Sequence, residues 1–176
     1  MQYDKVLEGK FINMRSVTVD DAKFAYDIRN EFRETIGQVA ASYEDQLKYI
    51  EKQIVTEGDY YFVITEKNGE PIGLNGVYDI KDGEGETGRF VCKGTPVQSI
   101  EAHLMLHDFA KNVLKLKKAH FVVYASNKKV VHLQKRMGQK FICWTERSGI
   151  ESAYFEDPLD DTLPEIIKMR DLVEKM

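Results

Sequence analysis

The sequence predicts an α/β fold of the α+β type, in which a mixed, mostly antiparallel central sheet is flanked by helices. Three observations predict it. Alternating apolar segments around a turn signal indicate antiparallel hairpins, one nearly continuous apolar strand indicates the middle of a sheet, and stretches with helical spacing separate them. The predicted order is βααβββαβαββ plus a terminal helix. Because a β-α-β unit follows the hairpins, the sheet should contain both parallel and antiparallel pairs.

The first part of the chain is predicted to form one strand and two helices. Residues 11–18 (FINMRSVT) alternate apolar and polar side chains, which favours a strand. Asp20 or Asp21 can cap the helix after it, whose core-facing side chains are Ala25, Ile28 and Phe32. A second helix is expected after Ser42, with an apolar stripe formed by Tyr43, Leu47, Ile50 and Ile54.

The hydrophobic period changes to that of strands near residue 60. Residues 60–80 are expected to form a hairpin around Asn68-Gly69, the strongest short-range turn signal in the chain. A further strand covers about 85–92. A long helix then follows, with an apolar stripe spaced for a core-facing side: Ala102, Leu106, Phe109, Val113 and Leu116.

The last part of the chain begins with the strand expected at the centre of the sheet, residues 119–126 (AHFVVYAS). Residues 127–137 then indicate a short helix that ends at Gly138, in the position of a C-terminal cap. The remaining expected elements are two strands and a helix: 139–147, 150–156 and a helix from about 163, opened by Thr162 and Pro164.

Composition and charge restrict the class of protein. A chain of 176 residues fits one domain, with a core over about 10–156 and a C-terminal helical extension over about 160–176. A net charge of −4 provides no field that would attract nucleic acid or an anionic membrane. The N-terminal segment lacks an apolar signal core, and no apolar run reaches the ~20 residues of a membrane span. A cytoplasmic location is therefore expected.

The cysteines and histidines indicate no metal or thiol chemistry. Cys92 and Cys143 lie in apolar, strand-like contexts, so buried and reduced thiols are expected. Nothing near Cys92 in the sequence would lower its pKa, which favours packing over a nucleophilic role. No pattern of His, Asp or Cys has the spacing of metal ligands, so no metal is predicted.

The segment SNKKVVHLQKRMGQKFI ends the central strand with Asn127 and follows the short helix with Gly138 and Phe141. With the order of elements, it resembles the strand–Asn–helix–Gly–Phe segment of the GNAT acyl-CoA N-acyltransferase superfamily, and the likeness covers about residues 10–156. The resemblance implies a GNAT-like fold and acetyl-CoA as co-substrate. It also implies that Asn127 contacts the pantetheine arm where the strands part.

The pair Arg29-Asn30, late in the first helix, is a second point of likeness. It is similar to the RN pair of the branch that contains ribosomal-protein N-terminal acetyltransferases and nucleotide-sugar N-acetyltransferases. By this resemblance Arg29 and Asn30 bind the acceptor substrate, and the polar segment 30–42 lines the acceptor side.

Residues 94–103 (GTPVQSIEAH) have the length and position of the family's pyrophosphate loop but not its glycines. Val97 and Ser99 stand at the usual Gly and Gly/Ala positions, and Pro96 has no N–H. A helix N-terminus attracts phosphate without glycine, so free N–H groups are expected at Gln98, Ser99, Ile100 and Glu101. The alternative is that CoA binding has been lost and the helix only packs. The cofactor-binding residues implied by the resemblance are Phe90, Val91, Cys92, Val97, Gln98, Ser99, Ile100 and Asn127.

Two catalytic candidates come from the same resemblance. Glu86 matches a carboxylate that acts as general base in several family members, although an exposed strand carboxylate beside Glu84 is an equal interpretation. Gln134 stands where many members have a tyrosine that reprotonates the leaving thiolate; a glutamine can hydrogen-bond to the sulfur but supplies no proton. His132 is turned about 200° from Gln134 along the helix and is expected at the surface.

Three functions remain open from the sequence. The first is an acetyl-CoA-dependent N-acetyltransferase acting on a small-molecule amine, with a nucleotide-linked amino sugar as the leading acceptor and with no nucleic-acid or membrane partner. The second is a protein N-terminal acetyltransferase of the ribosomal-protein type. The third is a non-catalytic acyl-CoA-binding relative. A homodimer is left open.

Overall fold

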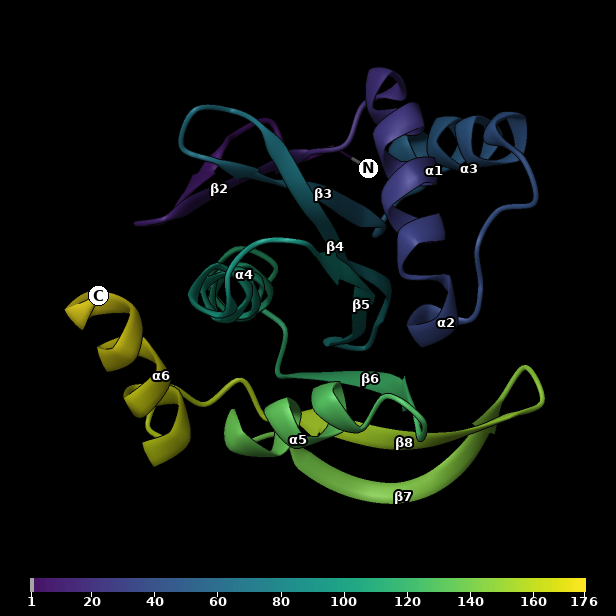
Figure 1. Ribbon diagram of the computed structural model, residues 1–176. Helices are drawn as coiled ribbons and strands as arrows, with labels where there is room; N and C mark the ends of the chain where they lie inside the picture. Colours follow the sequence, from purple (N-terminus) through teal and green to yellow (C-terminus); the bar gives the residue numbers. More distant parts are fainter. Residues whose placement is uncertain (1) are drawn as a thin grey trace.

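A computed structural model describes residues 2–176, and its centre is an eight-stranded sheet with the strand order β1-β2-β3-β4-β5-β6-β8-β7 (Figure 1). Among the strands of the described residues only β5 and β6 pair in parallel, so the sheet is mixed and mostly antiparallel, as the sequence predicts. The strands are β1 Leu7–Glu8, β2 Ile12–Ser16, β3 Tyr60–Glu66, β4 Pro71–Lys81, β5 Glu84–Cys92, β6 Lys118–Tyr124, β7 Lys140–Arg147 and β8 Ile150–Asp157.

The helices form two layers, one on each face of the sheet. The first layer packs on one face through the buried side chains of Ala25, Ile28 and Ile50. The second layer packs on the opposite face through Ala102, Leu106 and Phe109 (Figure 1). The first layer contains α1 Ala22–Glu31, α2 Arg33–Ile36 and α3 Tyr43–Val55; the second contains α4 Pro96–Asp108, α5 Lys128–Arg136 and α6 Pro164–Lys175.

Of the two helix caps predicted for the first layer, the structure has one and lacks the other. Ser42 caps α3 as predicted, because its hydroxyl accepts a hydrogen bond from the Asp45 N–H. Asp21, in contrast, does not cap α1 with its side chain. Its carboxylate accepts hydrogen bonds from the Thr18 N–H and pairs with Arg15 at 2.7 Å. Asp21 therefore ties the start of the first helical layer to the end of β2.

The long helix differs from its expected course at both ends. It begins at Pro96, with Thr95 as the N-cap and a capping box formed with Gln98. At its other end a π-helical turn covers Phe109–Val113, in which Leu114 N–H donates to the Phe109 carbonyl. A π turn contains one residue more than an α turn, so it changes the direction in which the later side chains point. Val113 is therefore 42% exposed, against the prediction that it faces the core.

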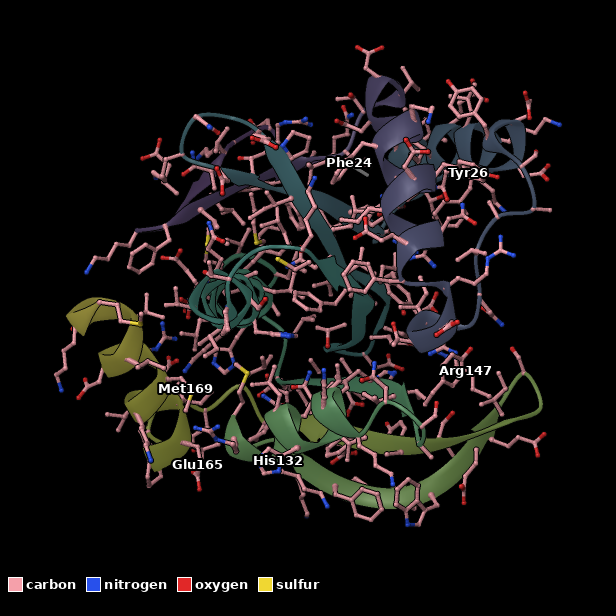
Figure 2. The ribbon with its side chains drawn as sticks, viewed as in Figure 1. Phe24, Tyr26, His132, Arg147, Glu165 and Met169 are labelled. Carbon is pink, nitrogen blue, oxygen red and sulfur yellow. The ribbon has the colours of Figure 1, made fainter. Side chains whose placement is uncertain are left out.

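The C-terminal helix α6 packs on α4 of its own chain, as Figure 2 shows for the labelled Met169. Ile166, Met169 and Val173 bury their side chains against Leu104 and Met137. Arg170 adds ion pairs to Asp108 at the end of α4 and to Asp161. The predicted C-terminal helix is confirmed, although its N-cap is Leu163, since Thr162 instead hydrogen-bonds to Asp160.

The two cysteines lie in different surroundings. Both are free thiols, but only Cys92 is partly buried; Cys143, on the edge strand β7, is exposed, against the expectation of burial. An edge strand leaves much of its surface uncovered, which a local apolar pattern does not reveal. Within residues 2–176, no helix has the length and apolar content needed to cross a membrane.

Candidate active site

The site begins where the two parallel strands part. β5 and β6 pair only over Glu84–Glu86 and Lys118–His120. Beyond these residues neither strand has the other as a partner, although both continue for several residues. Because the backbone edges that face this opening are unpaired by strands, they can donate to or accept from a ligand placed between them.

A bulge in β5 widens the opening. Leu74 pairs with Val91 and Gly76 with Gly88, so that Arg89 and Phe90 together oppose a single residue of β4. Arg89 has a φ of +58°, a conformation that is uncommon outside glycine. Bulges bend a strand and redirect its side chains. Here the bulge lies in the part of β5 that has left β6.

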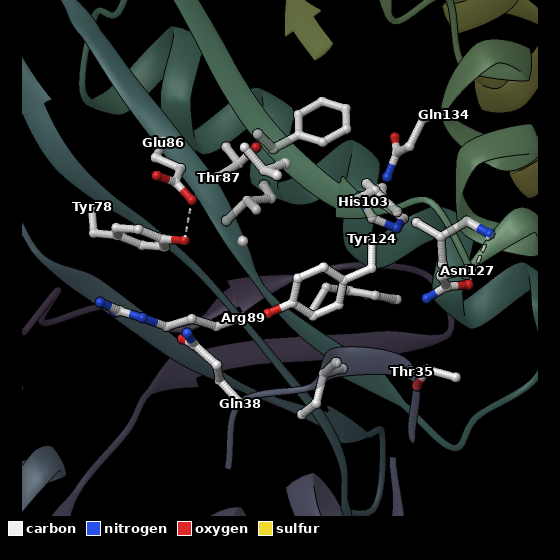
Figure 3. A pocket seen from close by; sticks show the side chains of 18 of the residues that line it. Thr35, Gln38, Tyr78, Glu86, Thr87, Arg89, His103, Tyr124, Asn127 and Gln134 are labelled. Carbon is white, nitrogen blue, oxygen red and sulfur yellow. Dashed lines mark hydrogen bonds between the residues drawn. The ribbon is translucent and has the colours of Figure 1, made fainter. Parts of the chain in front are cut away.

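A cavity of about 590 Å³ passes through this opening and reaches both helical layers (Figure 3). On the side of the first layer it is lined by Arg29, Thr35, Gln38 and Tyr49. On the side of the second layer it is lined by His103, Leu106, Asn127, Gln134 and Met137. The bulge and the ends of β5 and β6 form its middle. Two molecules can therefore approach the same point from opposite faces of the sheet.

Glu86 lies at the narrow end of the opening with its carboxylate toward the first layer. Its side chain is only 12% exposed, which excludes the interpretation as an exposed strand carboxylate. Oε1 accepts hydrogen bonds from the Tyr78 hydroxyl at 2.7 Å and from Arg147 Nη1. Burial, together with the Glu86 charge, raises the pKa of Tyr78 above its usual range, so the phenol stays protonated and donates.

The mouth on the first-layer side is bridged by Gln38. Its carbonyl accepts from Arg29 Nη2 at 2.7 Å, and its side-chain Nε2 donates to the Ser148 hydroxyl at 2.5 Å. Ser148 belongs to the β7–β8 turn, so the bond joins two segments that are distant in sequence. The preceding Gly37 has a φ of +69°, and a Cβ there would lie 2.5 Å from the Tyr124 ring. Only glycine lets this loop approach Tyr124 so closely.

On the second-layer side the cavity wall mixes apolar and polar side chains, among them the buried His107 and the partly buried His103. The His103 ring lies against Phe90, with centroids 4.2 Å apart. Burial lowers the pKa of His103 to about 4, so the ring is neutral at pH 7. Its Nε2 has no hydrogen-bond partner among residues 2–176. A buried polar atom of this kind is suited to a ligand that brings its own donor or acceptor.

The structure brings five of the twelve candidate residues from the sequence to this cavity: Glu86, Gln134, Phe90, Asn127 and Arg29. Gln134 is buried, whereas His132 is exposed on α5, as expected. Asn127 also caps α5 by accepting from the Val130 N–H at 3.3 Å. The other seven candidates do not line the cavity: Asn30, Val91, Cys92, Val97, Gln98, Ser99 and Ile100.

The candidates outside the cavity have identifiable structural contacts. Asn30 donates to the Tyr26 carbonyl and accepts from Arg33. The side chain of Val91 packs with the first helical layer, while that of Cys92 packs on the opposite face. Val97 and Ile100 pack against the cluster that joins α4 to α6.

The N–H groups at the start of α4 differ from the expected set. Ser99 N–H donates to the Thr95 carbonyl at 3.0 Å, and Ile100 and Glu101 lie further inside the helix. The prediction of free N–H groups at these three residues is therefore wrong, because the helix begins earlier. The fourth expected N–H, that of Gln98, is not free either, because it donates to the Thr95 hydroxyl at 3.4 Å. Val97, in the first turn, keeps an N–H without an intrahelical acceptor.

Several residues of the site have no signal in the local sequence. Arg147 and Glu86 are far apart in the chain, and Tyr78 meets Glu86 only through the strand register. His103 follows Ala102 of the apolar stripe of α4, and no neighbour in the sequence marks it as a cavity residue. The approach of Gly37 to Tyr124 could have been suspected, since a glycine in a polar segment often marks a positive φ.

In the part of the chain that the structure describes, one group of side chains has the spacing of metal ligands: His107, Asp108 and Asp161. Protein cations already occupy it. Lys111 lies 2.5 Å and Arg170 2.8 Å from the Asp161 carboxylate, and Arg170 also pairs with Asp108. The hydrogen bond from Lys111 helps hold the pKa of Asp161 at about 2. The cluster is explained as an ion-pair network that fastens α6.

Solved structures with this architecture are numerous, whereas no family model matches the sequence and no curated protein matches it. Apo FdhC, described as a nucleotide-linked sugar GNAT, has a TM-score of 0.79 and 21% identity over 98% of each chain. A GCN5-related N-acetyltransferase from Brucella melitensis has a TM-score of 0.79 and 14% identity over 97% of this chain and 86% of its own.

A third structure is spermidine N-acetyltransferase from Vibrio cholerae in complex with CoA and spermine. Its TM-score is 0.75 and its identity 16%, over 85% of this chain and 96% of its own. These likenesses cover between 85% and 98% of this chain. The chain therefore has the fold of the GNAT acetyltransferases.

Proposed function

We propose that the protein is an N-acetyltransferase that moves an acetyl group from acetyl-CoA to an amine of a small molecule, with a nucleotide-linked amino sugar as the preferred acceptor. The observation that carries the proposal is the cavity that passes through the opening between β5 and β6. It provides two entrances, one on each face of the sheet, and a single meeting point. Direct transfer between two bound substrates requires this arrangement.

The second-layer side of the cavity fits the acyl-CoA arm. Phe90, Leu106 and Met137 supply apolar surface, and the free Nε2 of His103 can bond to one of the amides of the arm. Asn127 and Gln134 add polar groups near the end of β6 and on α5. The pyrophosphate would lie outside the cavity, at the start of α4, where the helix dipole and the Val97 N–H favour an anion.

The first-layer side fits an acceptor that carries negative charge. Arg29, Arg89 and Arg147 line the cavity, against Asp45 and Glu86 as the acidic groups. A polyamine, the substrate named for the Vibrio cholerae structure, would gain more from an acidic wall than from the guanidinium groups of Arg29 and Arg147; Arg89 is already paired with Asp59. The nucleotide-linked sugar named for FdhC carries the phosphates that such a wall attracts.

The bridged mouth argues against a protein N-terminus as acceptor. An extended peptide needs an open groove for its backbone. The hydrogen bond between Gln38 and Ser148 joins the two segments that would form the sides of such a groove. A compact acceptor can enter beside this bond without breaking it.

In the proposed reaction Glu86 takes a proton from the acceptor's ammonium group, and the free amine attacks the thioester carbonyl. Backbone N–H groups of the β5 bulge would stabilise the oxyanion. The new C–N bond then replaces the C–S bond, and the second proton of the amine passes to the departing thiolate. Gln134 can hydrogen-bond to the sulfur but adds no proton, so one titratable residue suffices.

Thermal-shift measurements with acetyl-CoA, followed by an acceptor screen, test the proposal. Binding to the folded state should raise its stability by about 2.7 kcal/mol at a ligand concentration a hundredfold above the Kd. Acetylation should be fastest with a nucleotide-linked amino sugar and much slower with spermidine. An unchanged melting temperature at saturating CoA would overturn the proposal and favour the non-catalytic alternative.

A further inference from the structure

Arg147 occupies a position in which a substrate can compete for it. It is the last residue of β7 and precedes the turn Ser148-Gly149, where both residues have positive φ. Its side chain is 40% exposed and lines the cavity, yet its guanidinium is bonded to Glu86 (Figure 2 shows Arg147 between the β7–β8 hairpin and α2). Ion pairs with an exposed partner are weak and readily exchanged.

The hydrogen bond from Arg147 also occupies an oxygen of Glu86, the proposed general base. Oε1 of Glu86 accepts hydrogen bonds from both Arg147 and Tyr78. The ammonium group of an acceptor must displace one of these two donors to reach Oε1. While the pair persists, Glu86 is therefore hindered in the step that the proposed function assigns to it.

The other charges around Glu86 do not replace Arg147. On its own strand are Glu84, which faces Lys118, and Arg89, which is engaged by Asp59. Opposite on β6 lies His120, whose ring stacks on Tyr154. Arg147 is thus the one half-exposed guanidinium that contacts Glu86 among residues 2–176.

A second guanidinium stands close along the mouth. Arg29 bonds to the Gln38 carbonyl, and the Gln38 side chain bonds to Ser148, the neighbour of Arg147. The Gln38 bridge therefore places Arg29 and Arg147 at the two sides of one entrance. Two guanidinium groups at an entrance suit a diphosphate, because each can bind phosphate oxygens through paired N–H groups.

We propose that Arg147 is a positioning residue that couples acceptor recognition to catalysis, an inference that rests on the proposed function. In the free protein it pairs with Glu86; when a diphosphate-bearing acceptor binds, the guanidinium moves to the phosphates. Glu86 is then released and takes the proton of the ammonium group. The base becomes available only when an anionic acceptor is in place, so an amine that carries no phosphate reacts slowly.

The first test uses UDP as a probe, with CoA present at saturation, and requires no acetyl transfer. Calorimetry should give a Kd at least tenfold weaker for Arg147→Gln than for the wild type. Lys140→Gln, which removes a cation from the exposed start of the same strand, should leave the Kd unchanged. Carbon-13 NMR should show the Glu86 carboxyl signal moving on addition of UDP in the wild type, and not in Arg147→Gln.

The second test uses activity. With glucosamine, an amino sugar that carries no phosphate, free UDP should raise the acetylation rate of the wild type several-fold. Arg147→Gln should start at the higher rate and not respond to UDP, while its KM for a nucleotide-linked acceptor rises at least tenfold. An Arg147-independent Kd for UDP, or a Glu86 signal that UDP leaves in place, overturns this inference even if acetyl transfer is found. Failure of CoA to bind overturns the proposed function instead.

Discussion

Two arginine–carboxylate pairs of the site are separated by the side chain of Tyr78. They have the same chemical groups but differ in burial and in the number of hydrogen bonds. Arg89 binds Asp59 through both terminal nitrogens, at 2.5 and 2.8 Å, with side chains 14% and 15% exposed. Arg147 binds Glu86 through one nitrogen and is 40% exposed. Tyr78 contacts both pairs: its ring lies 4.0 Å from the Arg89 guanidinium, and its hydroxyl bonds to Glu86.

The difference shows how burial separates a structural ion pair from one that a ligand can use. Tyr61 and Tyr49 also lie near the Arg89 guanidinium, at 5.2 and 5.5 Å, so removal of either partner would leave a charge among aromatic rings. Burial raises the pKa of Tyr49 to about 12, which keeps this surrounding uncharged. Arg147 has water as an alternative partner. The first pair holds the bulge in shape, and the second remains exchangeable.

The largest expected effect lies on the exchangeable pair. Glu86→Gln should reduce kcat by roughly 10² to 10⁴, the usual contribution of a general base, with little change in the Kd for CoA. Glu84→Gln is the matched control, because that carboxylate is on the same strand and faces Lys118 away from the large cavity. Steady-state kinetics decide the matter. Equal loss in the two variants would remove Glu86 from the chemistry.

The buried pair should respond in stability. Arg89→Gln leaves Asp59 with a lost bidentate partner, and we expect the free energy of unfolding to fall by about 3 kcal/mol. For a chain of this length that corresponds to a melting temperature lower by roughly 10 °C. Arg147→Gln serves as the control and should change it little. A drop of the same size in Arg147→Gln would contradict the contrast between the two pairs.

The two pairs also mark how far the sequence can predict the site. The family resemblance predicts Glu86 as a site residue, and the local chemistry of capping predicts Ser42 as a helix cap, since both signals lie in a few adjacent residues. The sequence does not predict the ion pairs of Arg147 and Asp59, because the order of the strands and the bulge bring their partners to them. No local pattern encodes a contact between distant segments.

The start of α4, in contrast, has a signal in the local sequence. Thr95, Pro96 and Gln98 form a readable helix signal, with an N-cap, a proline in the first turn and a capping-box partner. Because the helix begins at Pro96, three of the four expected N–H donors, at Ser99, Ile100 and Glu101, lie inside it, and the fourth, at Gln98, is capped by Thr95. The π turn that exposes Val113 is not readable in this way, because it depends on how the helix meets the sheet.

A third buried group extends the comparison to a side chain without a partner. Burial lowers the pKa of His103 to about 4 from 6.5, so its neutral form stabilises the fold. That contribution is complete above pH 6.5 and is lost as the pH falls toward 4. Between pH 7.5 and 5 the wild type should lose roughly 2 kcal/mol more unfolding free energy than His103→Leu, as measured by urea unfolding.

His107 must be considered in the same experiment. Burial alone would lower its pKa, but the hydrogen bond with Asp157 at 3.0 Å and the nearby carboxylates raise it. Its contribution is therefore present at low pH and is lost as the pH rises through the raised pKa, opposite in sign to that of His103. Since both proteins retain His107, the difference between them isolates His103. Parallel pH profiles would show that His103 is not buried in neutral form.

The smallest expected effect is the coupling free energy between Arg147 and Glu86. A double-mutant cycle with Arg147→Gln and Glu86→Gln should give a coupling free energy of unfolding of about 1 kcal/mol or less, because one partner is 40% exposed and the bond uses a single nitrogen. The same cycle on Arg89 and Asp59 should give a coupling several times larger, and raising the salt concentration should weaken only the first. A coupling between Arg147 and Glu86 as large as that of the buried pair would mean that Arg147 is fixed in place. An acceptor could then not draw it away, and the release of Glu86 by substrate would be wrong on energetic grounds alone.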